Sequence, residues 1–194
     1  MRYSEEVETY DPVKIGTRIA WGRSHSVYHY GVNEVIRLPR AERLLGWLLR
    51  DGLDLRDRFM RDISVCEQYL GNYALTTRVV ESSKGEIATI QPYIKGRYLS
   101  KNELQNKAIK VQFQDMITRC EKMLAAGYLV DLIGQGGVLQ RRLSNVLVLP
   151  DGNLKLFDAG LADMRKIDRA PYITRFAITL ILKRQRSTLR FLLS

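Results

Sequence analysis

The chain has 194 residues and a mass of 22.4 kDa, enough for one ordinary domain or for two small lobes that share a core. Hydrophobic residues make up 45% of the sequence and charged residues 27%, which is typical of a folded globular protein and excludes a disordered one. No apolar run reaches the ~18–20 residues that a membrane span needs.

The compartment that the sequence predicts is the cytoplasm. The N-terminal segment is acidic and has no apolar stretch of the kind found in a secretory signal. Cys66 and Cys120 are too few and too far apart for a disulfide framework or a paired-cysteine metal site. His25 and His29 are the only histidines, so the sequence argues against zinc.

The net charge is 31 − 21 = +10, and the isoelectric point is about 9.7. A basic surface of this size favours an anionic partner, which is a phosphate ester, a nucleic acid or an acidic membrane surface. A basic face that is merely solvated is the alternative.

The first segment of the chain predicts an antiparallel meander. Four short runs are rich in β-branched or aromatic residues and are separated by glycines, and Pro39 ends the last of them. These runs are 13–15, 18–20, 26–30 and 34–38.

Helices and a hairpin follow the meander. Residues 44–49 form a short apolar run, and an apolar spacing typical of one helix face then begins at Phe59 and ends at Leu70. Residues 76–80 and 86–92 predict a hairpin, and residues 94–97 predict a connector between two lobes.

The second half predicts a long helix, a second hairpin and a basic tail. The helix covers residues 101–127, with an apolar stripe at Val111, Phe113, Met116, Ile117, Cys120, Met123 and Leu124. The hairpin pairs residues 145–149 with residues 154–158. The tail, 163–194, has eight Lys or Arg against two Asp and predicts one or two helices.

The second hairpin carries the strongest chemical signal. Asn145 opens its first strand, and Asp158 closes its second strand 13 positions later, followed by Ala159 and Gly160. A carboxamide and a carboxylate at adjacent strand ends supply the hard oxygen ligands that Mg²⁺ prefers. A plain hairpin with polar ends is the alternative. The pattern resembles the catalytic-loop Asn and the DFG motif of the protein-kinase-like superfamily, with Ala159 in place of Phe.

Two further motifs resemble the nucleotide-binding parts of that superfamily. Residues 20–28 resemble the glycine-rich loop that covers the ATP phosphates, and the resemblance implies phosphate contacts from Gly22, Ser24 and His25, although Gly22 is the only glycine left. Arg37 stands where the family has its phosphate-binding lysine, and a guanidinium also binds phosphate.

The remaining nucleotide-binding positions follow in order along the chain. The resemblance implies that Asp62, or alternatively Glu67, on the preceding helix pairs with the phosphate-binding cation. Gln91 and Tyr93 resemble the hinge that reads the adenine edge in small bacterial kinases related to aminoglycoside phosphotransferases. ATP and Mg²⁺ are therefore the implied cofactors.

The chain departs from the family at the catalytic aspartate, five residues before the catalytic-loop Asn, where it has Gln140. Glutamine cannot accept the proton of a substrate hydroxyl as a carboxylate can. Asp131 is a candidate substitute for this base, and a structural carboxylate at the end of a helix is the alternative for that residue.

The resemblance implies an α+β, protein-kinase-like, two-lobe fold. The N-lobe, residues 1–93, would contain the antiparallel sheet, and residues 94–194 would form a reduced, mostly helical C-lobe. The short C-lobe also resembles the YrbL-type proteins of the PhoP regulatory network and the lipopolysaccharide-core sugar kinases.

Three functions remain open. The first is ATP-dependent phosphoryl transfer, with low or atypical activity, to a hydroxyl of a protein, a sugar or a small molecule. The second is a pseudokinase that binds nucleotide and acts as a scaffold. The third is binding of an acidic protein, a nucleic acid or an anionic membrane by the basic tail. Binding to an anionic membrane would place the protein at the inner membrane surface. Few aromatic residues for base stacking interleave with the tail's charges, so nucleic acid is the least favoured partner.

Overall fold

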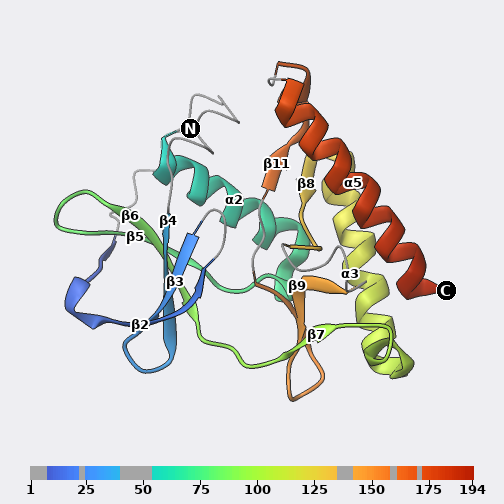
Figure 1. Cartoon of the computed structure of the whole chain (residues 1–194), viewed down its shortest axis with the longest axis horizontal. Coiled ribbons are helices and arrows are strands. Elements are labelled where there is room, and N and C mark those ends of the chain that lie inside the picture. The colour runs from blue at the N-terminus through green and yellow to red at the C-terminus, as the bar shows by residue number, and fades with distance from the viewer. Residues whose placement is uncertain (1–7, 22–24, 40–53, 135–141, 158–160, 170–171) are drawn as a thin grey trace. The chain divides into compact units, whose positions relative to one another are not determined.

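The computed structural model describes residues 8–21, 25–39, 54–134, 142–157, 161–169 and 172–194. The chain divides into two compact units (Figure 1). The first unit contains Met1–Ser64 and Thr76–Tyr93, and the second contains Val65–Leu75 and Ile94–Ser194. The mixed α+β composition agrees with the fold class that the sequence predicts.

The first unit is built on a six-stranded sheet with the order β1-β5-β6-β4-β3-β2. All neighbouring strands are antiparallel except β1 and β5, which pair in parallel, so the sheet is not purely antiparallel as predicted. The strands are β1 (Glu8–Thr9), β2 (Ile15–Trp21), β3 (His25–Tyr30), β4 (Glu34–Pro39), β5 (Arg78–Glu81) and β6 (Ile87–Pro92). The predicted meander is β2–β3–β4.

One face of this sheet is covered by a small apolar core. Tyr10, Tyr30, Ile36, Val80, Ala88 and Ile90 are buried together. The expected strand at 13–15 begins later than predicted, because Asp11 caps a 3₁₀ turn at Pro12–Lys14 by accepting a hydrogen bond from the Val13 N–H.

Helix α2 (Leu55–Leu70) confirms the predicted helix. Asp54 begins it, since its Oδ1 accepts the Asp57 N–H at 2.7 Å. Gly71 ends it with a φ of +55°, a left-handed conformation that suits glycine. Val65 and Leu70 are buried in the core of the second unit.

The second unit combines two long helices with two small sheets, of order β10-β9-β7 and β11-β8. Its elements are η2 (Gly71–Tyr73), β7 (Arg97–Leu99), η3 (Glu103–Gln105), α3 (Lys107–Ala125), β8 (Tyr128–Val130), β9 (Leu143–Val148), β10 (Leu154–Leu156), β11 (Leu161–Asp163), η4 (Met164–Arg169) and α5 (Tyr172–Leu193). The predicted second hairpin is β9–β10, whereas β8 and β11 were not predicted. The predicted connector at 94–97 leads into a strand, β7.

Helix α3 carries the centre of the core. Asn106 caps its first turn, and Phe113, Met116 and Met123 are fully buried. Val111 is 58% exposed, so its predicted place in the apolar stripe was wrong. It lies two residues, or about 200°, before Phe113 on the helix and therefore points the opposite way.

Helix α5 is a single helix that closes the same core. Leu192 is buried in the core, and Leu189 and Phe191 pack against it. Within the described ranges, no helix is long and apolar enough to cross a membrane.

Helix α3 offers a stability test with a control on the same helix. We expect Phe113→Ala to lower the free energy of unfolding by about 3–5 kcal/mol, because it leaves a cavity in the core. Val111→Ala should change it by less than ~0.5 kcal/mol. Denaturant unfolding measures both, and equal losses would contradict the assigned burial.

Candidate functional site

The best-defined part of the candidate site surrounds Asn145 in β9. Its side chain is buried, and its Nδ2 donates a hydrogen bond to the backbone oxygen of Asp131 at 2.8 Å. The Phe157 N–H donates to the Asn145 backbone oxygen at 3.1 Å, which joins β9 to the segment that leads to Asp158. Since Nδ2 is occupied, Oδ1 is the atom of this carboxamide that can bind a cation.

Gly134 leaves the space that Asn145 occupies. A Cβ on Gly134 would lie 2.3 Å from Asn145 Oδ1, much closer than any non-bonded contact. The φ of Gly134 is +63°, which also favours glycine. A glycine is therefore required here for two independent reasons, the close contact and the backbone conformation.

Asp131 shapes the loop that receives Asn145. Its Oδ1 accepts hydrogen bonds from the N–H groups of Ile133 at 2.9 Å and Gly134 at 3.1 Å. This is an Asx turn, in which a short carboxylate holds the backbone two and three residues ahead. The contacts give Asp131 a structural role, so they favour the structural alternative over that of a substitute base.

Helix α5 supports the same loop from a distant part of the chain. Gln185 is buried, and its Oε1 accepts the Leu132 N–H at 3.1 Å. The backbone N–H of Asn145 donates to the Leu132 oxygen at 3.3 Å. The backbone N–H and the backbone oxygen of Leu132 are thus both hydrogen-bonded. The sequence did not reveal the role of Gln185, because 53 residues separate it from Leu132.

The strand pair β8–β11 joins the strand that leads into the loop to the segment that follows Asp158–Gly160 in the sequence. Asp163 pairs with Tyr128, and Leu161 pairs with Val130, the residue just before Asp131. The first residue after the Asp158–Gly160 motif is therefore anchored beside the strand that leads into the loop.

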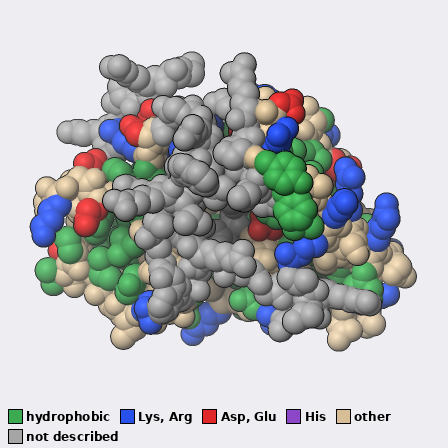
Figure 2. All heavy atoms as spheres, turned by 45° about the horizontal axis from the view of Figure 1, so that its top comes forward, with side chains coloured by type: hydrophobic (Ala, Val, Ile, Leu, Met, Phe, Trp, Pro, Cys, Tyr) green, Lys and Arg blue, Asp and Glu red, His purple; other side chains and the backbone are tan. Residues whose placement is uncertain are grey.

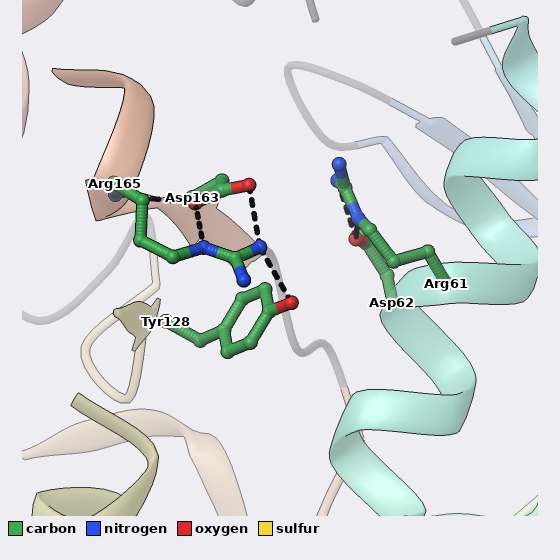
Figure 3. Close-up of polar contacts among 5 residues, drawn as sticks. All are labelled: Arg61, Asp62, Tyr128, Asp163 and Arg165. Carbon is green, nitrogen blue, oxygen red and sulfur yellow. Dashed lines mark hydrogen bonds and ion pairs between the residues drawn. The ribbon is translucent and has the colours of Figure 1, made fainter. Parts of the chain in front are cut away.

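A polar cluster reinforces the pair β8–β11 (Figure 3). Arg165 donates to both carboxylate oxygens of Asp163 at 2.9 Å and to the Tyr128 hydroxyl at 2.6 Å, and its guanidinium lies 4.4 Å from the centre of the Tyr128 ring. The hydrogen bonds to Asp163 raise the pKa of Arg165, so it stays charged. Gly127 is needed beside it, because a Cβ there would lie 2.4 Å from Arg165 Cγ.

The first unit brings together two of the predicted phosphate-binding side chains. Arg37 Nη2 lies 3.4 Å from His25 Nδ1, and the His25 ring lies against the Phe59 ring with 5.8 Å between their centres. The two residues come from adjacent strands, β3 and β4. The other predicted loop residues, Gly22 and Ser24, lie outside the described residues.

The two acidic candidates on α2 differ in their surroundings. Asp62 is partly buried with an exposed side-chain fraction of 20%, and its Oδ1 accepts two N–H groups of Arg61 at 2.9 and 2.7 Å (Figure 3). Glu67 is exposed and lies about 140° away around the helix. Burial therefore favours Asp62 as the internal acidic partner, and its predicted pairing with Arg37 stays a prediction.

The predicted hinge is the end of β6. Tyr93 donates its N–H to the Asn33 oxygen at 2.8 Å, and its ring meets the His29 ring edge-on at 4.9 Å. Gln91 is buried, with 6% of its surface exposed.

One face of the first unit's sheet carries several polar side chains among buried valines. Directly opposed residues of antiparallel strands point to the same side, and Arg37 opposes Thr89 while Val35 opposes Gln91. Thr89 Oγ1 and Gln91 Oε1 are both buried, and neither has a hydrogen-bond partner in the described part of the protein. Buried polar atoms of this kind are normally bonded, so they are candidates for contact with a polar ligand.

The other catalytic candidates are outside what the structure describes. Gln140 and Asp158 both belong to this group. Among the described residues, no three His, Cys, Asp or Glu side chains gather as a metal site. Burial raises the pKa of Cys120 to about 12, so this thiol is not a nucleophile near neutral pH.

The fold of the chain is protein-kinase-like. Comparisons with protein families and with curated proteins find no match. Eighty chains of solved structures do match. One of them is the Lpg2603 kinase of Legionella pneumophila bound to IP6, with 11% sequence identity and a TM-score of 0.57. The alignment covers 91% of this chain and 58% of the Legionella chain, so this chain spans little more than half of that kinase.

The contact between Gln185 and Leu132 gives a test of the loop. We expect Gln185→Met to lower the free energy of unfolding by about 1–3 kcal/mol, because it leaves a buried N–H without an acceptor. Hydrogen exchange at the Leu132 amide should become faster. Gln114→Met, the same change at an exposed position of α3, should alter neither quantity; unchanged exchange in Gln185→Met would contradict the contact.

Proposed function

We propose that this protein binds a Mg²⁺–nucleoside triphosphate, with ATP as the nucleotide, and transfers its terminal phosphoryl group to a hydroxyl acceptor at a low rate. The observation that carries the proposal is the fixed carboxamide of Asn145. Its Nδ2 is anchored on Asp131, which leaves Oδ1 as the atom that would bind a cation, and its backbone is bonded to the strand end that leads to Asp158. The kinase-like fold supports the same assignment.

Each predicted residue would have a distinct role. Asn145 and Asp158 would hold Mg²⁺, which neutralises charge on the phosphates, and Arg37 would bind phosphate oxygens as a planar cation. Gln91 and Thr89 offer buried polar atoms on the face that carries Arg37, where they would bond to the base. Phosphoryl transfer depends mainly on positioning and on charge neutralisation, so these groups retain value without a strong general base.

A pseudokinase is the second candidate, and one observation favours it. Gln140 stands at the position of the catalytic base, and the carboxylate of Asp131 is already used by two backbone N–H groups. On this alternative the protein would bind nucleotide and act through a partner. The departures from the family at Arg37 and Gln140, together with the basic helix α5, support the proposal of a YrbL-type protein under either alternative. We propose a cytoplasmic location for both.

Thermal unfolding tests nucleotide binding. At a Mg²⁺–ATP concentration about a hundredfold above the Kd, we expect the melting temperature to rise by roughly 5–10 °C. Asn145→Ala and Asp158→Ala should abolish the rise. Asp151→Ala, on the exposed turn of the same hairpin, should keep it. No rise in the unmodified protein at millimolar nucleotide would exclude both the enzyme and the nucleotide-binding pseudokinase.

Replacement of Gln140 separates the two candidates. If the missing carboxylate limits the rate, Gln140→Asp should increase the transfer of label from γ-labelled ATP by about 10²–10⁴. Gln140→Asn, which introduces a side chain of the same size as Asp without its charge, should not increase the transfer. Absence of label transfer in both the unmodified protein and Gln140→Asp, with nucleotide binding intact, would favour the pseudokinase.

A further inference from the structure

The outward face of helix α5 is both apolar and basic. Tyr172, Phe176 and Leu180 are 74%, 55% and 42% exposed, although side chains of this kind are usually buried. They are spaced four residues apart, so they lie on one side of the helix. The rings of Tyr172 and Phe176 are stacked, with 6.5 Å between their centres. Together these three residues form an apolar ridge.

The same side of α5 continues as a basic surface. Lys183, Arg186 and Arg190 are exposed and lie within about 60° of one another around the helix axis, on the side of the apolar ridge. The whole helix contains five Lys or Arg and no Asp or Glu. A helix face that is merely solvated usually mixes both signs, because opposite charges four residues apart stabilise it.

The opposite side of α5 packs against the rest of the second unit. Ile178, Gln185 and Leu192 are buried, and Gln185 is bonded to the Leu132 backbone. These contacts fix the orientation of the helix, so the side that carries the apolar ridge and the basic surface stays exposed. Lys and Arg side chains extend from the right-hand side of the molecule, where α5 ends (Figure 2), and exposed hydrophobic side chains lie near them.

We propose that this face of α5 docks on the surface of an anionic membrane. The apolar ridge would enter the boundary between headgroups and acyl chains, and the basic surface would lie on the anionic headgroups. A second copy of the chain is a poor occupant, because two such faces would bring three positive charges against three. Since no described helix can span a bilayer, the proposed contact is parallel to the surface.

Binding of the full chain to vesicles tests this proposal. One set of vesicles contains phosphatidylcholine alone, and the other contains phosphatidylcholine and phosphatidylglycerol at about 70:30. We expect sedimentation with the anionic vesicles to be at least tenfold stronger. The combined variant Lys183→Gln, Arg186→Gln and Arg190→Gln should weaken binding by about a hundredfold at low salt.

A matched control distinguishes the face from the net charge. The combined variant Lys107→Gln, Lys110→Gln and Lys122→Gln removes three exposed charges from α3 and should retain most of the binding. An equal loss in both variants would overturn the proposal, because any positive surface would then suffice. Absence of binding to anionic vesicles, including retention on RNA only, would also overturn it.

The apolar ridge has its own readout. The variant Phe176→Trp adds one tryptophan to the ridge, and its fluorescence is obtained by subtracting the spectrum of the unmodified protein. This fluorescence should shift to shorter wavelength when anionic vesicles are added. The combined variant Tyr172→Ser and Phe176→Ser should bind at least tenfold more weakly while its circular dichroism and melting temperature show that it is folded. Unchanged emission together with unchanged binding would overturn the insertion of the ridge.

Discussion

The geometry of the candidate site depends on the side-chain carboxamide of Asn145, whose nitrogen and oxygen have different roles. Asn145 donates its Nδ2 to the backbone of Asp131, and this bond fixes the direction in which Oδ1 points. The bond is possible only because Gly134 has no Cβ, and the loop that contains Gly134 is shaped by the carboxylate of Asp131 and by Gln185. The strand pair β8–β11 adds to this arrangement by holding the strand that leads into the loop.

The parts of the fold that the sequence predicts correctly are those with local signals. The spacing of apolar residues predicts α2, and the turn at residues 150–153 predicts β9–β10. Asn145 was also found from a local pattern, its spacing from Asp158, although it was expected to open a strand and is the third residue of β9, which begins at Leu143. By contrast, the pair β8–β11 has no local signature, because each strand is only three residues long.

The grouping of Arg37, Thr89 and Gln91 on one face of the first unit's sheet could not be predicted without the strand order. Thr89 and Arg37 are far apart in sequence, and only the pairing of β6 with β4 places them opposite one another. The same holds for Gln91, which the sequence identified through its likeness to a hinge and not through its buried side chain. The prediction that Val111 belongs to the apolar stripe of α3 was wrong for a simpler reason. It is an apolar residue close in sequence to the stripe, but it lies on the other side of the helix.

Gln185 illustrates how a supporting residue can escape detection by sequence comparison. Its partner is the main-chain N–H of Leu132, which every amino acid except proline supplies. The hydrogen bond itself therefore does not depend on which side chain stands at position 132, although the buried side chain of Leu132 is constrained by the core. A bond from a side chain to a main-chain group leaves no paired side-chain signature in the sequence, so a residue such as Gln185 is recognised only once the fold is known.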